Sequence, residues 1–317
     1  MQSGRVTLLG GSGFVGRALC AELARRGKSI TVITRDPRHG RELQTLPRLA
    51  LVRVDAWDPS ELAAVIRGSA AVVNLVGILN ERRDDGHGFR HVHRELTASV
   101  LTACSLAGVS RYVHMSALNA SPSGPSHYLR SKGEAEALVE ASGLEATVFR
   151  PSVIFGHGDG LFCRFEQLLR TSPVLPLACA ATRFQPVFVG DVAAAFVLAL
   201  ETRGTIGQRY DLGGPDIMTL LEIVQAVLAA RGWRRLVLPL GPVASRIMAE
   251  VMEHLPGKPF SRDNFRSASV DSVVPAGSVG LAALGLSATS VASVLPGLLG
   301  GLNEAARHDR RRRLAGR

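Results

Sequence analysis

The apolar residues in the first half of the chain form short runs separated by longer stretches with helical spacing. The runs are rich in Val and Ile and cover residues 6–9, 30–34, 51–54, 71–76, 112–115 and 146–149. Runs that are apolar nearly throughout are typical of strands buried on both faces of a parallel sheet. The stretches between them, 15–26, 60–67, 89–107 and 128–142, have the length and spacing of helices. This alternation predicts an α/β fold built on a doubly wound parallel sheet.

The regular alternation stops after Arg150-Pro151. Residues 161–170 have helical spacing, 186–189 and 210–212 are strand-like, and 219–302 are mostly helical and irregular. We therefore expect one sheet domain from residues 1–151 and 187–212. A smaller, mostly helical C-terminal lobe from residues 152–186 and 213–302 would form the substrate side. Within it, the segment 242–255 has a helical stripe of apolar residues, which we expect to cover a substrate pocket or contact a partner rather than to insert into lipid.

The charge of the chain is concentrated at one end. The 317 residues include 37 Lys and Arg against 27 Asp and Glu, which gives a formal net charge of +10. Six arginines lie between Arg307 and Arg317, so about half of the net charge belongs to a tail, 303–317, that we expect to be disordered. The charge therefore does not imply a specific nucleic-acid groove.

Cysteine usage and the termini favour a cytoplasmic protein. The four cysteines are scattered without a CxxC spacing, and no His/Cys cluster is present, so we expect neither disulfides nor a metal site. The N-terminus lacks the charged and then apolar build of a signal peptide. Residues 272–303 carry no charge, but Pro, Gly and Ser interrupt them, so we expect no transmembrane span. The basic tail would allow peripheral binding at the inner face of the membrane.

A glycine-rich turn follows the first apolar run. The segment Gly10-Gly-Ser-Gly13-Phe14-Val15-Gly16 lies at a strand–turn–helix junction. Gly10 would permit the tight turn, Gly13 would let the backbone approach a pyrophosphate, and Gly16 would allow close packing of helix on strand. The start of the helix, including Phe14 and Val15, would then face the phosphates with its partial positive charge. The turn predicts a Rossmann-type dinucleotide site.

The end of the second run bears on the choice of cofactor. An acid there would bind the adenosine ribose hydroxyls and favour NAD. This chain has Thr34 at that place, followed by Arg35, while Arg17 follows the last glycine. Two guanidinium groups suit a 2′-phosphate, so we expect NADP (NADPH), with NAD as the alternative. Asp55, after the third run, would either bind the adenine amine or cap the next helix.

Tyr128 and Lys132 are the candidate catalytic pair. They are four residues apart on a predicted helix and so share a face. Lysine is scarce in this chain, with only three, which makes the spacing notable. An ammonium group beside a tyrosine stabilises phenolate, so Tyr128 could exchange a proton with a substrate while nicotinamide moves hydride. Ser116, after the fifth run, is the candidate third member, although Ala117 or Asn119 could occupy the equivalent place.

Several motifs together resemble one superfamily. Beside the glycine turn and the Tyr128–Lys132 pair, the chain has the segments Asn74-Leu-Val76-Gly77, Arg150-Pro-Ser-Val-Ile-Phe-Gly and Val187-Phe-Val-Gly-Asp-Val-Ala. These are similar to the extended and atypical short-chain dehydrogenases/reductases, the NAD(P)-dependent epimerases and dehydratases. Within that superfamily the chain is most similar to the nucleotide-binding accessory subunit of respiratory complex I and its bacterial relatives.

The resemblance implies roles for individual residues. Gly10, Gly13 and Gly16 would hold the pyrophosphate, and Val76 and Gly77 would line the adenosine and ribose side. Tyr128 would be the acid/base, and Lys132 would lower its pKa and hold the nicotinamide ribose. His93 stands where many relatives have an asparagine that bonds backbone and, through water, the lysine. Several members of the complex I subgroup keep the nucleotide but are not known to turn over a substrate.

Two functions follow as hypotheses. The first is an NADP(H)-binding oxidoreductase or epimerase/dehydratase that acts on an unidentified small molecule by Tyr–Lys chemistry. The second is a non-catalytic nucleotide-binding accessory or assembly subunit of a respiratory or quinone-biosynthesis complex at the membrane.

Overall fold

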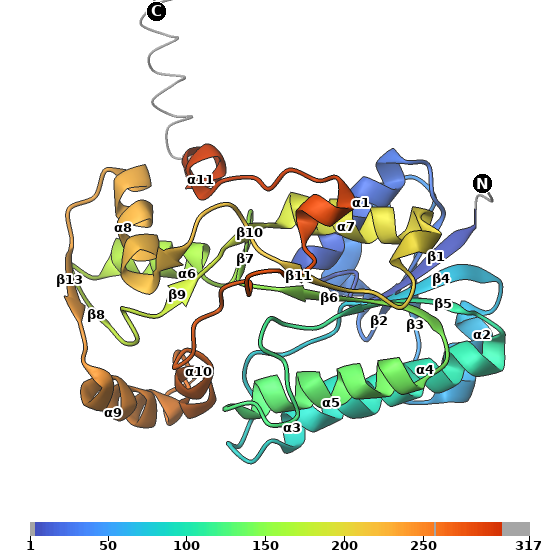
Figure 1. The fold of residues 1–317 in the computed structure, drawn as a ribbon, viewed down its shortest axis with the longest axis horizontal. Coiled ribbons are helices and arrows are strands. Elements are labelled where there is room, and N and C mark those ends of the chain that lie inside the picture. Colours follow the sequence, from blue (N-terminus) through green and yellow to red (C-terminus); the bar gives the residue numbers. More distant parts are fainter. Residues whose placement is uncertain (1–3, 257, 300–317) are drawn as a thin grey trace, which may run out of the picture.

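A seven-stranded parallel sheet forms the centre of the larger lobe (Figure 1). The coordinates are a computed structural model that describes residues 4–256 and 258–299. The strand order β11-β6-β5-β4-β1-β2-β3 reverses direction at β1, as in a doubly wound Rossmann-type sheet. The strands are β1 (Arg5–Leu9), β2 (Ile30–Thr34), β3 (Leu49–Arg53), β4 (Ser69–Asn74), β5 (Arg111–Met115), β6 (Glu145–Pro151) and β11 (Arg209–Leu212). The expected fold class is confirmed.

Helices cover both faces of this sheet (Figure 1). One face carries α1 (Phe14–Arg25) and α7 (Val189–Glu201), and the other carries α2 (Pro59–Ile66), α4 (Leu96–Ala107) and α5 (His127–Ala141). The helix expected over residues 89–107 consists of three parts. A short helix, α3 (His87–Arg90), leads into a π-helical turn, His91–Glu95, and then into α4.

The apolar runs are continuous because each strand feeds two cores. Leu8 contributes to the core under α1 and α7, whereas its neighbour Leu9 contributes to the core under α2 and α4. All five residues of β2 are buried for the same reason. Alternate residues of a strand point to opposite faces of the sheet. When helices cover both faces, both sets of residues are apolar, so the sequence of the strand does not alternate between apolar and polar residues.

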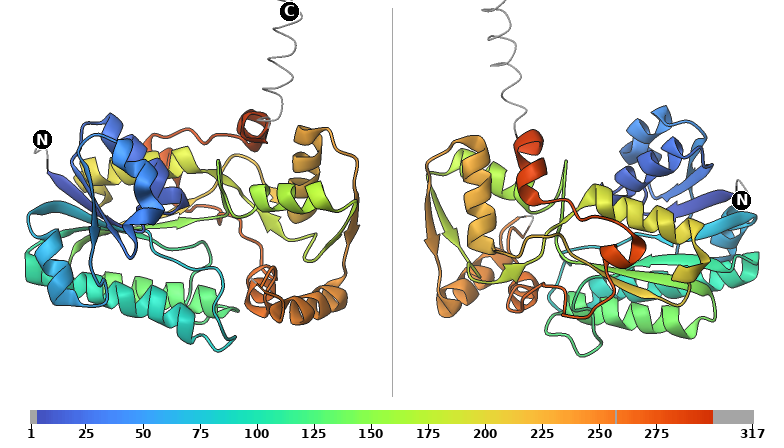
Figure 2. Two further views of the ribbon diagram at one scale, coloured as in Figure 1. Left: turned by 180° about the vertical axis from the view of Figure 1, so that it is seen from behind. Right: turned by 45° about the horizontal axis from the view of Figure 1, so that its top comes forward.

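The second lobe is mostly helical and lies beside the carboxyl ends of the strands (Figures 1 and 2). Its helices are α6 (Phe162–Thr171), α8 (Leu220–Arg231), α9 (Pro242–Glu253), α10 (Arg262–Ser267) and α11 (Val291–Leu299). Three strand pairs complete it: β7 (Ile154–Phe155) with β10 (Val187–Phe188), β8 (Val174–Leu177) with β13 (Leu236–Pro239), and β9 (Arg183–Phe184) with β12 (Met218–Thr219). Phe155, Phe162 and Ile223 lie in its own apolar core.

Some boundaries differ from those expected. The strand expected over 71–76 ends at Asn74, so Val76 and Gly77 lie in the loop after β4. The tail expected to be disordered, 303–317, lies outside the described residues. Within the described part of the chain, we find no helix that combines the length and the apolarity needed to cross a bilayer.

Candidate active site

The glycine turn connects β1 to α1 at the carboxyl edge of the sheet. Gly10 has a φ of +77°, which favours glycine, and a Cβ there would lie 3.1 Å from the backbone of Leu75 and Val76. A Cβ on Gly16 would lie 2.5 Å from the Gly11 Cα and closer still to the Gly10 carbonyl oxygen. The exposed Gly13 is the residue that precedes α1, which begins at Phe14 and Val15. The turn thus brings backbone against backbone and leaves the helix start open.

The end of β2 presents arginine rather than acid. The buried Thr34 hydroxyl donates to the Asp36 carbonyl oxygen at 3.0 Å, so it is engaged locally. Asp36 accepts from the Arg38 backbone N–H at 3.0 Å and forms an ion pair with the Arg38 guanidinium at 2.8 Å. Arg35 is exposed between them. The acid nearest to this strand end is therefore neutralised by a neighbouring arginine.

Arg17 and Asp55 have partners within the protein. The Arg17 Nε forms an ion pair with Glu42 at 2.7 Å and donates to the Ser12 carbonyl oxygen at 3.0 Å. Asp55 is exposed and accepts from the Trp57 N–H at 3.0 Å. The alternative that Asp55 caps the following helix is wrong, because Asp58 caps α2 through the N–H groups of its first turn. Asp58 directly precedes the helix, and Asp55 is too far back to reach it.

Lys132 is a buried ammonium group held by backbone. It is 2% exposed, and its Nζ donates to the Met115 carbonyl oxygen at 3.0 Å and to the Val76 carbonyl oxygen at 3.4 Å. A Cβ on Gly77 would lie 3.3 Å from this Nζ. Burial lowers the pKa of Lys132 to about 8, against the opposing effect of Glu136 one turn later. Lys132 therefore links the carboxyl ends of β4 and β5.

Tyr128 is partly exposed, and its ring makes edge contacts with Phe89 and His93, at centroid distances of 6.0 and 5.5 Å. Burial raises the pKa of Tyr128 to about 12. The Lys132 ammonium is directed at the carbonyl oxygens of Met115 and Val76, and the expectation that Lys132 lowers the pKa of Tyr128 stays a prediction.

The Ser116 hydroxyl is buried and has no hydrogen-bond partner among the described residues. Ser116 directly follows Met115, the residue whose carbonyl oxygen accepts a hydrogen bond from Lys132. A buried hydroxyl without a partner is unfavourable and indicates a place for a ligand atom. The alternative Ala117 is buried and has no polar atom to offer. Asn119 has a φ of +64°, and its amide donates to the Asp271 carbonyl oxygen at 2.7 Å.

His93 connects the loop after β4 to the tyrosine helix. Its Nε2 accepts the Ile78 N–H at 3.1 Å, so its Nδ1 carries the proton and donates to Ser131 Oγ at 2.8 Å. Ser131 in turn donates to the Tyr128 carbonyl oxygen at 2.9 Å. Burial, followed by the charges of Lys132 and His114, keeps the pKa of His93 well below its usual value. The hydrogen bond between the His93 imidazole and the Ile78 backbone corresponds to the one that the resemblance assigns to an asparagine in many relatives. His93 lies in a π-helical turn, and such turns are often found at functional sites.

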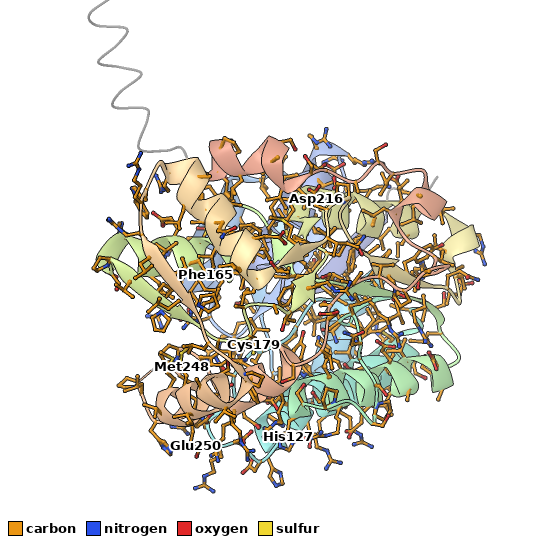
Figure 3. All side chains as sticks on the ribbon, turned by 60° about the vertical axis from the view of Figure 1, so that its left-hand side comes forward. His127, Phe165, Cys179, Asp216, Met248 and Glu250 are labelled. Atoms are coloured by element: carbon orange, nitrogen blue, oxygen red, sulfur yellow. The ribbon has the colours of Figure 1, made fainter. Side chains whose placement is uncertain are left out.

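Sequence reasoning missed Asp263, which lies in α10 and caps the tyrosine helix. Its buried carboxylate accepts the His127 N–H at 2.7 Å and the Tyr128 N–H at 3.1 Å. Figure 3 labels His127 at this end of α5. Asp84 lies within 4.8 Å of the same groups, but Arg266 pairs with both carboxylates. We interpret this cluster as an ion-pair network that joins the two lobes.

The comparisons with known proteins agree with this geometry. Residues 10–161 match the model of an NAD(P)H-binding family. NADH dehydrogenase (ubiquinone) 1 alpha subcomplex subunit 9 of Arabidopsis thaliana is 34% identical over 77% of this chain and 62% of that protein. The subunit 9 of Dictyostelium discoideum is 30% identical over 84% of this chain and 74% of its own length. The chain therefore belongs to the same family as this subunit 9, and its residues 10–161 have the sequence of an NAD(P)H-binding domain.

Some of the proteins that are similar to this chain in sequence or in structure are named as enzymes. The ceramide reductase of Caulobacter vibrioides is 31% identical over 63% of this chain and 62% of its own length. The chain thus spans less than two thirds of some curated relatives. Among solved structures, the dTDP-glucose 4,6-dehydratase DesIV of Streptomyces venezuelae superposes with a TM-score of 0.73 at 22% identity, over 93% of this chain and 95% of that one. This likeness extends the shared fold to both lobes.

Proposed function

We propose that this protein is an NADP(H)-dependent oxidoreductase that uses Tyr128, Lys132 and Ser116. The observation that carries the proposal is the unpaired, buried Ser116 hydroxyl next to the ammonium-bound Met115. A desolvated lysine and an unsatisfied hydroxyl both lower stability, and a substrate oxygen at this place would give the Ser116 hydroxyl the partner that it lacks. The ceramide reductase among its relatives supports the same reading.

The residues divide the chemistry as follows. A bound nicotinamide supplies or accepts hydride. The Ser116 hydroxyl donates a hydrogen bond to the substrate oxygen, and Tyr128 transfers the proton at that oxygen. Lys132 turns from the carbonyl oxygen of Val76 toward the nicotinamide ribose, which brings its charge nearer to Tyr128 and lowers the phenol pKa from about 12. Gly77 leaves room for this movement.

Arginine at the adenosine end supports NADP rather than NAD. Arg35 is exposed at the end of β2, and the acid that follows it, Asp36, is already paired with Arg38. Arg17 would exchange Glu42 for the 2′-phosphate, and Asp55 would bind the adenine amine. The glycine turn Gly10–Gly16, with Gly13, Phe14 and Val15 at the helix start, would bind the pyrophosphate.

NADPH fluorescence titration and turnover test the proposal together. We expect wild-type protein to bind NADPH at submillimolar concentration and to oxidise it with a substrate that carries a ketone, either a keto lipid or a keto nucleotide sugar; the names of one relative and one structural neighbour suggest these two classes. Tyr128→Phe should keep NADPH binding within about twofold and lower turnover at least 100-fold. Absence of NADPH binding would refute the cofactor, and equal turnover of the variant would refute the role of Tyr128.

The sequence identity of 30–34% with subunit 9 of two organisms supports a second candidate function. In this case the protein is a nucleotide-binding accessory subunit, located in the cytoplasm at the inner face of the membrane, and it docks on a respiratory or quinone-pathway complex. Purification of the tagged protein from solubilised membranes should then recover such a complex, and Tyr128→Phe should leave its assembly and activity unchanged. Recovery of the protein without either kind of complex argues against this function.

A further inference from the structure

The outer end of the second lobe exposes an unusual number of large apolar side chains. On α9, Val243, Ile247 and Val251 are 74%, 59% and 60% exposed, and their spacing of four places them on one face. Leu255, just past the helix, continues the line at 46%. Leu236 and Leu238 of β13, immediately before α9, are 56% and 43% exposed. We call these six residues the apolar rim.

The apolar rim does not cover a substrate pocket. The opposite face of α9, with Ser245 and Ala249, is the buried one, and the Ser245 hydroxyl accepts the Cys179 N–H at 3.2 Å. Figure 1 shows α9 and β13 at the end of the molecule remote from the seven-stranded sheet, and Figure 3 looks toward that end, with Met248 and Glu250 labelled on α9. The rim thus faces outward, where it is free to contact a protein partner or a lipid surface, and the charges around it favour one of the two.

The unpaired exposed charges nearest the start of the rim are basic. Residues 231–249 contain four arginines and no acid, and one of them, Arg231, pairs with Glu166. Arg234, Arg235 and Arg246 are exposed, and the guanidinium groups of Arg231 and Arg235 lie over the ring of Trp233, 5.6 and 5.8 Å from its centroid. The acids that follow on α9 are engaged, since Glu250 pairs with Arg262 and Glu253 with Lys258.

We infer that the rim binds an anionic lipid surface. A helix whose apolar face projects beside arginine and tryptophan is the arrangement of interfacial membrane helices, in which apolar side chains enter the acyl boundary and cations remain at the headgroups. A second copy of this chain would bring like charges together at the rim. The inference does not depend on catalysis by Tyr128, because it concerns the opposite end of the second lobe.

Co-sedimentation of the full chain with vesicles tests the inference. We expect at least tenfold stronger binding to equal parts phosphatidylglycerol and phosphatidylcholine than to phosphatidylcholine alone. The double variant Ile247→Glu/Val251→Glu should reduce anionic binding at least tenfold. Arg234→Glu/Arg246→Glu should reduce it more than 20-fold, since each basic residue near the surface contributes about fivefold. Leu106→Glu, at a side chain 54% exposed on α4, is the matched control and should bind as wild type does.

Further measurements separate other sources of binding. NADPH affinity checks that each variant is folded. Replacement of Arg310, Arg311, Arg312 and Arg313 by Ala removes tail attraction and should leave the effect of the rim variants intact. With Trp57→Phe as background, the emission of Trp233 should shift to the blue on anionic vesicles. The inference is overturned if wild-type protein does not bind these vesicles, or if the rim variants bind them as well as wild type does. It is also overturned if the rim variants lose binding to a purified membrane protein in the absence of lipid but keep their binding to the vesicles.

Discussion

The glycine turn and the Tyr128–Lys132 region lie at the same edge of the same sheet, but they affect the stability of the fold in opposite ways. At the turn, side chains are absent, and backbone packs directly on backbone at Gly10 and Gly16. At the other region, a buried ammonium and an unpaired hydroxyl occupy the protein interior. The first arrangement serves folding and cofactor binding together. The second lowers stability, and under the proposed function these same groups take part in the reaction, so function and stability would oppose each other here.

Gly16→Ala should have the largest effect and should impair both properties. The new Cβ would meet the backbone of Gly10 and Gly11, which cannot move aside as a flexible side chain would. We expect a loss of about 3 kcal/mol in the free energy of unfolding and at least tenfold weaker NADPH binding. Denaturant titration measures the first effect. Gly204→Ala is the control, because its Cβ would meet only a methyl group at 3.8 Å. Equal stability of the two variants would contradict the comparison.

Lys132→Met should separate the two properties. The lowering of the Lys132 pKa to about 8 corresponds to about 3 kcal/mol of destabilisation at neutral pH. The variant leaves two carbonyl oxygens without a donor, so we expect a net gain of about 1–2 kcal/mol and loss of turnover.

The pH dependence of this gain provides a sharper check. Because the folded state binds the Lys132 proton less tightly than the unfolded chain, the gap between variant and wild type is full below pH 8. It closes as pH rises from about 8 toward the ordinary lysine pKa of 10.5. Thermal unfolding at pH 7 and pH 9.5 measures the gap. A gap that widens with pH would show that burial does not lower this pKa.

Ser116→Ala should repeat the separation on a smaller scale. Since the hydroxyl has no partner, its removal should raise the free energy of unfolding by up to about 1 kcal/mol while turnover falls about 10–100-fold. Ser99→Ala is the matched contrast, because the equally buried Ser99 hydroxyl donates to the Ala56 carbonyl oxygen at 2.9 Å. That variant should lose about 1 kcal/mol and keep its turnover. Similar changes in the free energy of unfolding of both variants would show that the Ser116 hydroxyl is not unpaired in the way that the structure indicates.

Arg35→Ala should leave stability unchanged and affect only cofactor choice. The side chain is exposed, so we expect a change below about 0.5 kcal/mol in the free energy of unfolding. NADPH should bind about tenfold more weakly, whereas NADH affinity should stay the same, because only NADPH carries the 2′-phosphate. Fluorescence titration with both cofactors measures this, with the exposed Arg67→Ala as control. An equal loss for NADH would assign Arg35 another role.

The sequence predicted the parts that local pattern determines. The strands β1 and β2, the turn at Gly10 and the helix that carries Tyr128 follow from apolar runs and glycine spacing within a few residues. The fold class predicted from these patterns is confirmed, and the NAD(P)-binding family, which was predicted from the resemblance of several motifs, is confirmed as well. The sites of Tyr128, Lys132, Ser116 and the two arginines at the cofactor remain predictions.

Other features could not be read locally because distant residues create them. The Asp263 cap on α5 and the ion pair between Arg17 and Glu42 depend on how separate elements meet. The state of Tyr128 also escaped prediction, since spacing shows that Lys132 shares its face but not where the ammonium points. The two-residue strands of the second lobe are too short to produce a recognisable alternation of apolar and polar residues in the sequence.

The Asp263 cap has a consequence for the order in which the chain is completed. Asp263 lies 136 residues after His127, so the first amides of α5 lack this partner until synthesis has passed residue 263. A nascent chain released from the ribosome up to residue 250 would contain every strand of the large sheet and the glycine turn. Its helix α5 would begin with the Ser126 cap alone, without the carboxylate that accepts the His127 and Tyr128 N–H groups. The sheet and the glycine turn would thus be complete before the start of the helix that carries Tyr128 has all of its partners.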